Sequence, residues 1–327
     1  MQNLIIAVFT LYILFKPLSV WSSNSPLGEY QSKGALTGKI NSTGSDTLAN
    51  LMSFWADEFK HRFPNVEFEL HSEGSTTAPP ALLAGTSNLA PMSRKMRAAE
   101  LALFQQKFGY QPLAIKVAMD AIAVFVHRDN PLDAITIEQL DRIFSEHTLC
   151  GRHAKIVHWG EAGLTGQWAG KKITVLGRDP RSGSYSFFKE ISLCGGDFSL
   201  DMEALPGSGS IVQAISNNHN AIGFSGMGYK TSGVRTLPII HNGIMTLPNI
   251  SAETNWDYPL TRFLYLYINK TPSEPLPEVL REFILLVLSN TGQHTVELDG
   301  YAAVSETIIE ENLQKLAIPF VKNPALH

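Results

Sequence analysis

A strand, a short loop of glycine and hydroxyl residues, and a helix follow one another repeatedly along the chain. Residues 39–63 read KINSTGSDTLANLMSFWADEFKHRF, in which apolar side chains recur at helical spacing after the glycine. Residues 171–191, KKITVLGRDPRSGSYSFFKEI, repeat the pattern. Short strands that alternate with helices predict an α/β fold with parallel strands.

Two long β-type segments, near residues 115–126 and 262–268, stand apart from the short strands. A β segment of this length predicts a chain that crosses from one lobe to another. We therefore expect a discontinuous first lobe, 26–119 and 258–327, and a second lobe at 120–257. The segment 136–144, TIEQLDRIF, predicts a short helix capped by Thr136.

The N-terminus indicates export. The apolar run Leu4–Phe15 is too short for a membrane span and is followed by small residues, which favours a signal peptide at 1–22 over a retained anchor. We expect a periplasmic or secreted protein. In that compartment Cys150 and Cys194 are expected to form a disulfide rather than to remain two free thiols.

Three predicted strand-to-helix loops share one chemistry. GSDTL (44–48), EGSTT (73–77) and RDPRSGS (178–184) each place glycine and hydroxyl residues where a helix begins. Free N–H groups and the helix dipole favour an anion there, and Arg178 or Arg181 could supply a permanent positive charge. The alternative is that these residues only cap their helices.

Other classes of function have little support. The net charge is −4, so no overall basic field attracts nucleic acid. There is no G-x-S-x-G motif, and His153 and His158 have no metal-site spacing, so we expect no catalytic residue, metal or cofactor. The RKMR run at 94–97 is expected to be a solvated helix face.

The order of several motifs resembles that of a known family. Among them are GSDTLANL, GSTTAPPAL, NLAPMSRKM, MDAIAVFVHRDNP and GRDPRSGSYSFFKE. Together they resemble the periplasmic phosphate-binding proteins of ABC importers. The resemblance implies a two-lobed type II periplasmic binding fold, with mixed, mostly parallel sheets, a two-strand hinge and one dehydrated phosphate between the lobes. It also implies a permease partner and a monomeric state.

The resemblance implies a set of phosphate-binding residues, carried over by position. They are Ser45, Thr47, Leu48, Ser75, Ser93, Arg178, Ser182, Gly183 and Ser184.

Two positions depart from the family pattern. Ser93 stands where many members have an aspartate that accepts the proton of phosphate, and Asp46, Glu73 or Asp179 could replace that acceptor. Pro180–Arg181 stands where the family has an acidic residue and a glycine, so the orienting partner of Arg178 is left open.

The leading hypothesis is extracytoplasmic phosphate binding and delivery to an ABC importer. An alternative is a secreted protein that uses the same fold in adhesion, matrix or phosphate sensing. A phosphatase-like enzyme is a weaker third possibility, because the chain shows no activated nucleophile or metal cluster.

Overall fold

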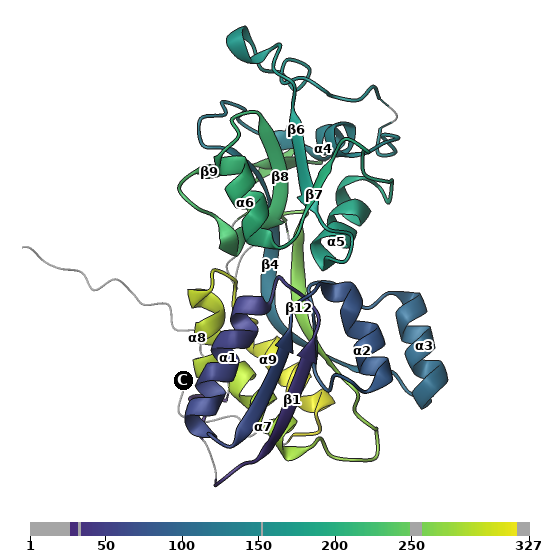
Figure 1. Cartoon of the computed structure of the whole chain (residues 1–327), viewed down its shortest axis with the longest axis vertical. Coiled ribbons are helices and arrows are strands. Elements are labelled where there is room, and N and C mark those ends of the chain that lie inside the picture. The colour runs from purple at the N-terminus through teal and green to yellow at the C-terminus, as the bar shows by residue number, and fades with distance from the viewer. Residues whose placement is uncertain (1–26, 32–33, 152, 249–256, 319–327) are drawn as a thin grey trace, which may run out of the picture.

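Two lobes are joined by two long strands (Figure 1). The structure is a computed structural model, and it describes residues 27–31, 34–151, 153–248 and 257–318. The expected signal peptide at 1–22 lies outside these residues. The long strands are β4 (Leu113–His127) and β12 (Thr261–Ile268), which confirms the two predicted crossings. Across the described ranges, no helix combines the length and apolar character of a membrane span.

The lower lobe in Figure 1 holds the helices that flank the N-terminal strands and those that follow β12. Its elements are β1 (Gly38–Thr43), α1 (Ala49–Arg62), β2 (Val66–His71), η1 (Ser75–Thr77), α2 (Ala78–Ala84), β3 (Ala90–Met92), α3 (Ala98–Phe108), α7 (Glu278–Leu288), α8 (Asn290–Leu298) and α9 (Glu306–Lys315).

The upper lobe holds the elements between the two long strands. They are β5 (Ile135–Thr136), α4 (Ile137–Phe144), η2 (Gly166–Trp168), β6 (Thr174–Arg178), α5 (Gly183–Ser192), β7 (Glu203–Leu205), α6 (Ser208–Ser216), β8 (Ala221–Gly226), η3 (Met227–Tyr229), β9 (Val234–Leu237), β10 (Ile239–His241) and β11 (Ile244–Thr246). The helix α4 confirms the prediction, because the Thr136 side chain accepts a hydrogen bond from the backbone N–H of Gln139.

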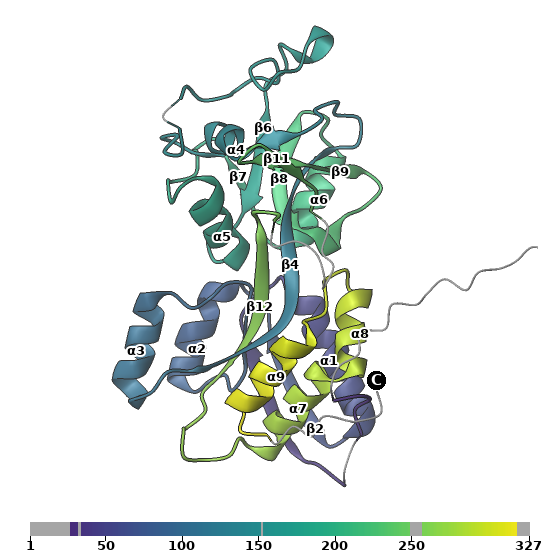
Figure 2. The same ribbon diagram turned by 180° about the vertical axis from the view of Figure 1, so that it is seen from behind.

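The largest sheet runs through both lobes. Its strand order is β3-β12-β4-β8-β6-β7, with β9 paired to β4. The pairs of β6 with β7 and β8 are parallel, whereas β4 pairs antiparallel with β8, β9 and β12. The expectation of mostly parallel sheets is therefore wrong for this sheet. The reason is that β4 carries the chain from the first lobe to the second and β12 carries it back, so the two hinge strands run in opposite directions (Figure 2).

Each lobe has its own hydrophobic core. One cluster, around Trp55, Phe59 and Phe283, draws buried residues from 36–118 and 264–316. Another, around Phe144 and Phe224, draws them from 121–260. The core changes near residues 118–121, whereas Tyr258 and Leu260 pack in the second core, so the boundaries at 119/120 and 257/258 stay predictions.

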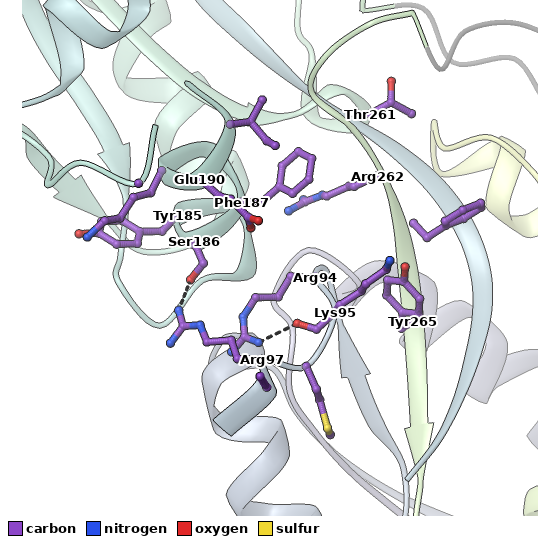
Figure 3. Close-up of a pocket in the computed structure, with 16 residues that line it drawn as sticks. Arg94, Lys95, Arg97, Tyr185, Ser186, Phe187, Glu190, Thr261, Arg262 and Tyr265 are labelled. Carbon is purple, nitrogen blue, oxygen red and sulfur yellow. Dashed lines mark hydrogen bonds between the residues drawn. The ribbon is translucent and has the colours of Figure 1, made fainter. Parts of the chain in front are cut away.

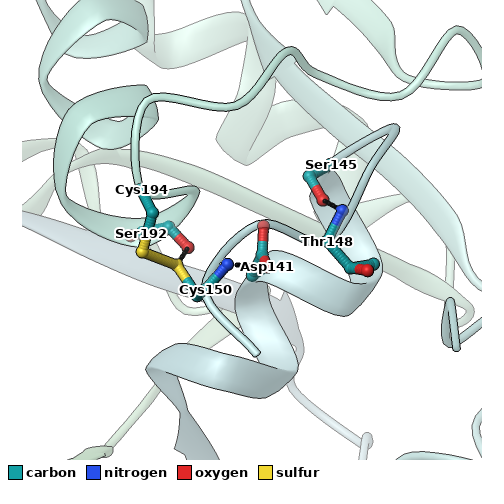
Figure 4. Close-up of a disulfide and its surroundings, with 6 residues drawn as sticks. All are labelled: Asp141, Ser145, Thr148, Cys150, Ser192 and Cys194. Carbon is teal, nitrogen blue, oxygen red and sulfur yellow. Dashed lines mark hydrogen bonds between the residues drawn. A yellow bond between two sulfur atoms is a disulfide. The ribbon is translucent and has the colours of Figure 1, made fainter. Parts of the chain in front are cut away.

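A disulfide ties α4 and its following turn to the end of α5 (Figure 4). Cys150 and Cys194 are bonded, with their Cα atoms 5.3 Å apart, which confirms the predicted pair. The backbone N–H of Cys150 donates to the buried Asp141 carboxylate at 2.7 Å. The bond therefore anchors the C-terminal end of α5, the helix whose N-cap is Ser182.

Removal of this disulfide should destabilise the second lobe. The bond joins residues 44 apart in the sequence, and closing a loop of that length is worth roughly 4 kcal/mol in the chain-entropy model, with 2–4 typical of measurements. We expect the Cys150→Ser/Cys194→Ser variant to lose about that much in urea denaturation followed by tryptophan fluorescence. Equal stability of the variant and the oxidised protein would contradict the prediction.

Candidate functional site

The three predicted loops meet where the two lobes face one another. The first lies before α1, the second leads through η1 into α2, and the third leads from β6 into α5. All nine predicted residues are buried: Ser45, Thr47, Leu48, Ser75, Ser93, Arg178, Ser182, Gly183 and Ser184. Their burial away from water makes this a site where hydroxyl and guanidinium groups need a polar partner.

Contacts across the interface bring residues of both lobes together. The Oγ1 atom of Thr47 lies 3.4 Å from the Oγ atom of Ser184. Within the first lobe, the hydroxyls of Ser75 and Ser93 are 3.1 Å apart. A Cβ atom added at Gly183 would clash with both of these hydroxyls. A side chain at residue 183 would therefore force these two hydroxyls to move, and glycine lets the loop of the second lobe approach the first without that shift.

Some of the hydroxyls cap the loops. Ser182 is the N-cap of α5, and its Oγ atom accepts from the N–H of Ser184 at 3.1 Å. Ser45 likewise accepts from the N–H of Thr47 at 3.2 Å. A hydroxyl that accepts such a bond keeps its own hydrogen for donation. Ser182 therefore does cap its helix, as the alternative stated. A capping hydroxyl can still donate a hydrogen bond to an anion.

The two arginines of the third loop have different environments. Arg178 is fully buried; its Nη1 donates to Ser208 at 2.6 Å and its Nη2 donates to Asp46 of the other lobe. Burial lowers the pKa of the Arg178 guanidinium, and Asp46 opposes that shift. Arg181 is 58% exposed and pairs with Asp179 at 3.1 Å. Arg178 is therefore the only one of the two placed for an enclosed anion.

The three candidate acids, Asp46, Glu73 and Asp179, differ in their contacts, and only Asp46 binds Arg178. Asp46 is 15% exposed and binds Arg178, whereas Asp179 binds Arg181 and Glu73 is exposed. The partner comes from the opposite lobe, so the family's acidic residue next to the arginine is not needed to orient it.

A second buried ion pair lies beside the loops, on the hinge strands. Asp120 of β4 faces Arg262 of β12, and its Oδ2 atom accepts from Nε at 2.9 Å and from Nη2 at 2.7 Å. Arg262 also donates to the Ser184 hydroxyl at 2.8 Å. The pair thus connects the hinge directly to the third loop.

The predicted set omitted this pair, and it also omitted Ser208 and Tyr301, whose hydroxyl donates to the Thr47 carbonyl at 2.8 Å. A charge inside each long apolar strand is a signal that could have found Asp120 and Arg262. Ser208 and Tyr301 carry no such signal.

The two ion pairs leave four buried polar atoms without a partner in the part of the chain that the structure describes. They are Asp46 Oδ1, Asp120 Oδ1, Arg178 Nε and Arg262 Nη1. Such atoms are costly unless something satisfies them. A set with both acceptors and donors suits an oxyanion that still carries a proton, because that ion can donate as well as accept.

A cavity of about 1010 Å³ opens beside the loops, between α5, β12 and the start of α3 (Figure 3). Arg262 lines it, together with the cationic side chains of Lys95, Arg97 and Lys189 and the carboxylate of Glu190. Arg97 spans the lobes there and donates to Ser186 at 2.7 Å. The cavity therefore presents mainly positive charge next to the third loop.

The run RKMR at 94–97 is not a solvated helix face. Arg94 is buried, and both of its terminal nitrogens donate to Glu100 at 2.7 Å. Arg97 is the N-cap of α3. The expectation failed because Arg94 precedes the helix and folds back to neutralise an acid in the first turn of α3.

Comparison with known proteins shows which family this chain resembles. A family model described as a PBP superfamily domain matches residues 30–291. The phosphate-binding protein PstS of Pseudomonas aeruginosa PAO1 is 47% identical over 294 residues, which cover 89% of this chain and 91% of the relative. This chain belongs to the PstS family of the PBP superfamily.

Solved structures resemble this PstS-family chain over most of its length. A Clostridium perfringens structure, described as a phosphate ABC transporter substrate-binding protein with phosphate bound, has a TM-score of 0.68 at 26% identity; the match covers 82% of this chain and all of that one. An ABC-type phosphate transport receptor from Vibrio cholerae has a TM-score of 0.62 at 22% identity, covering 80% and 99%. The two-lobed periplasmic binding fold expected from the sequence is confirmed.

Breaking the Asp120–Arg262 pair should be costly. Removal of one partner leaves a buried charge alone, which costs about 3–5 kcal/mol, whereas replacement of both partners by apolar residues costs much less. In this PstS-family chain we expect Asp120→Leu alone to lower the free energy of unfolding by that amount. Asp120→Leu with Arg262→Met should restore part of the loss in urea denaturation. Additive losses in the double-mutant cycle would show that the two side chains are not coupled.

Proposed function

We propose that the chain binds inorganic phosphate between its lobes and delivers it to the membrane permease of an ABC importer. The observation that carries the proposal is that buried groups of the two lobes meet: the hydroxyls of Thr47 and Ser184 lie 3.4 Å apart, and the buried Arg178 pairs with Asp46 of the other lobe. The names of the Pseudomonas and Clostridium relatives support the same ligand. In this proposal the protein acts in the periplasm or after secretion, as a monomer, and without covalent chemistry or a cofactor.

The proposed mechanism is closure of two half-sites on one anion. Thr47 and the backbone N–H of Leu48 belong to one half-site; Arg178, Ser184 and the N–H of Gly183 belong to the other. Arg178 supplies charge, hydroxyls and amides donate hydrogen bonds, and the beginnings of α1 and α5 add their positive helix dipoles. Rotation about β4 and β12 would separate the half-sites and release the ligand.

Loss of Arg178 should remove tight phosphate binding. We expect Arg178→Ala to weaken binding by roughly 30-fold to several thousand-fold, the range for truncating one member of a buried charged pair. Isothermal titration calorimetry on phosphate-free protein measures this, with circular dichroism to check the fold. Arg181→Ala is the matched control, because Arg181 is exposed and pairs with Asp179; it should bind like the parent chain. A folded Arg178→Ala protein with unchanged affinity would refute the site.

We also propose that Asp46 accepts the proton of phosphate, in place of the aspartate that Ser93 replaces. Asp46 has one buried carboxylate oxygen without a partner among the described residues, and its negative charge would repel fully ionised sulfate. Asp46→Asn keeps the shape and a hydrogen-bonding group but removes the charge.

The Asp46→Asn variant should discriminate less well between the two anions. We expect its ratio of phosphate to sulfate affinity to fall by about tenfold or more. The free oxygen of the Asp46 carboxylate receives no proton from sulfate, and a buried charged group left without a hydrogen bond costs more than about 1.4 kcal/mol. Calorimetry with both anions at pH 7 measures the ratio. An unchanged ratio would exclude Asp46 as the acceptor, and equal binding of both anions to the parent chain would exclude phosphate as the specific ligand.

A further inference from the structure

Two imidazoles and a carboxylate meet in the second lobe, away from the phosphate loops. His127 is the last residue of β4, Asp129 follows in the next turn, and His219 lies between α6 and β8. One ligand atom from each of the three lies within 4.8 Å of the other two. At about 3.3 Å per strand residue, His127 is roughly 23 Å along β4 from Asp120. The cluster is thus separate from the site described above.

The two histidines are packed face to face. Their ring centroids are 3.8 Å apart and their planes differ by 22°. His127 is only 6% exposed, so its ring is held in place, while His219 and Asp129 are exposed and free to adjust. The His219 ring makes no hydrogen bond or ion pair with any residue in the described ranges, which leaves its nitrogens available.

One ring nitrogen of His127 already faces Asp129. Its Nδ1 accepts a hydrogen bond from the N–H of Asp129 at 3.2 Å, and an ion bound to this nitrogen would displace that hydrogen bond. The Asp129 Oδ2 atom lies 3.6 Å from the same nitrogen. The other carboxylate oxygen faces the exposed Arg128 at 3.9 Å, a weak competitor in water.

We propose that His127, Asp129 and His219 bind a zinc ion, with water as the fourth ligand. Two imidazoles and one carboxylate are a common zinc donor set, with bonds of about 2.0–2.2 Å. Ligand atoms around such an ion lie closer together than 4.8 Å, so binding requires the exposed Asp129 and His219 side chains to rotate and the two stacked rings to separate. The ion would replace the hydrogen bond from the Asp129 N–H to His127 Nδ1. It would also connect the segment between α6 and β8 to the end of β4.

The test is zinc binding by the full chain without an affinity tag. Zinc is titrated against a chromophoric chelator in phosphate-free buffer, because zinc phosphate is poorly soluble. We expect one zinc per chain, and a loss of affinity of at least about tenfold in His219→Asn, since even outer-sphere partners of a metal are worth about 10–100-fold. At the same zinc concentration, zinc should also raise the Tm of the parent chain more than that of His219→Asn.

The controls separate this site from other histidines and from phosphate binding. His153→Asn is the matched control, because His153 is exposed and pairs with Glu138 elsewhere in the second lobe; it should bind zinc like the parent. Asp129→Asn provides a second ligand variant at an exposed position, where folding is not at risk. Equal zinc affinity in the parent chain and His219→Asn, or binding weaker than about 1 mM, would overturn the proposal. Phosphate affinity of His219→Asn should equal that of the parent.

Discussion

The ion pair between Asp120 and Arg262 is the contact on which the arrangement of the molecule depends. It lies where the two hinge strands pass from one lobe to the other, and it is almost fully buried. A lone charge at this point would be strongly destabilising, so each strand requires the other in this register. Because Arg262 also donates to Ser184, the same pair sets the position of the third loop relative to the hinge.

Apart from the Arg178–Asp46 ion pair, the contacts described between the lobes are polar and individually weak. Thr76 donates from its backbone and its side chain to the Arg181 carbonyl, and Arg97 donates to Ser186. Each such bond contributes about 0.5–1.5 kcal/mol net, except where a charge strengthens it. An interface of this kind holds the lobes together but can exchange its bonds for water when they separate. That property fits a binding protein that must release its ligand.

Much of the fold, and the meeting of the three candidate loops, could be predicted from the sequence, because both depend on local patterns. Ser45, Thr47 and Ser184 lie in loops that a strand and a helix define on either side. The partner of Arg178 could not be chosen from sequence, since Asp46 is 132 residues away and reaches it only across the lobes. The pairing of His127 with His219 is equally invisible, because chain topology alone brings β4 beside the α6–β8 connection.

The path of the chain also imposes an order of assembly. The core around Phe144 and Phe224 uses residues 121–260, so it can be completed while the chain is still being synthesised. The core around Trp55 needs α7, α8 and α9, which come last. Until β12 arrives, Asp120 has no arginine opposite it, and the first core lacks its members from residue 264 onward. A chain that ended at residue 261 would therefore have every member of the second core, an incomplete first core, and an Asp120 carboxylate without its arginine.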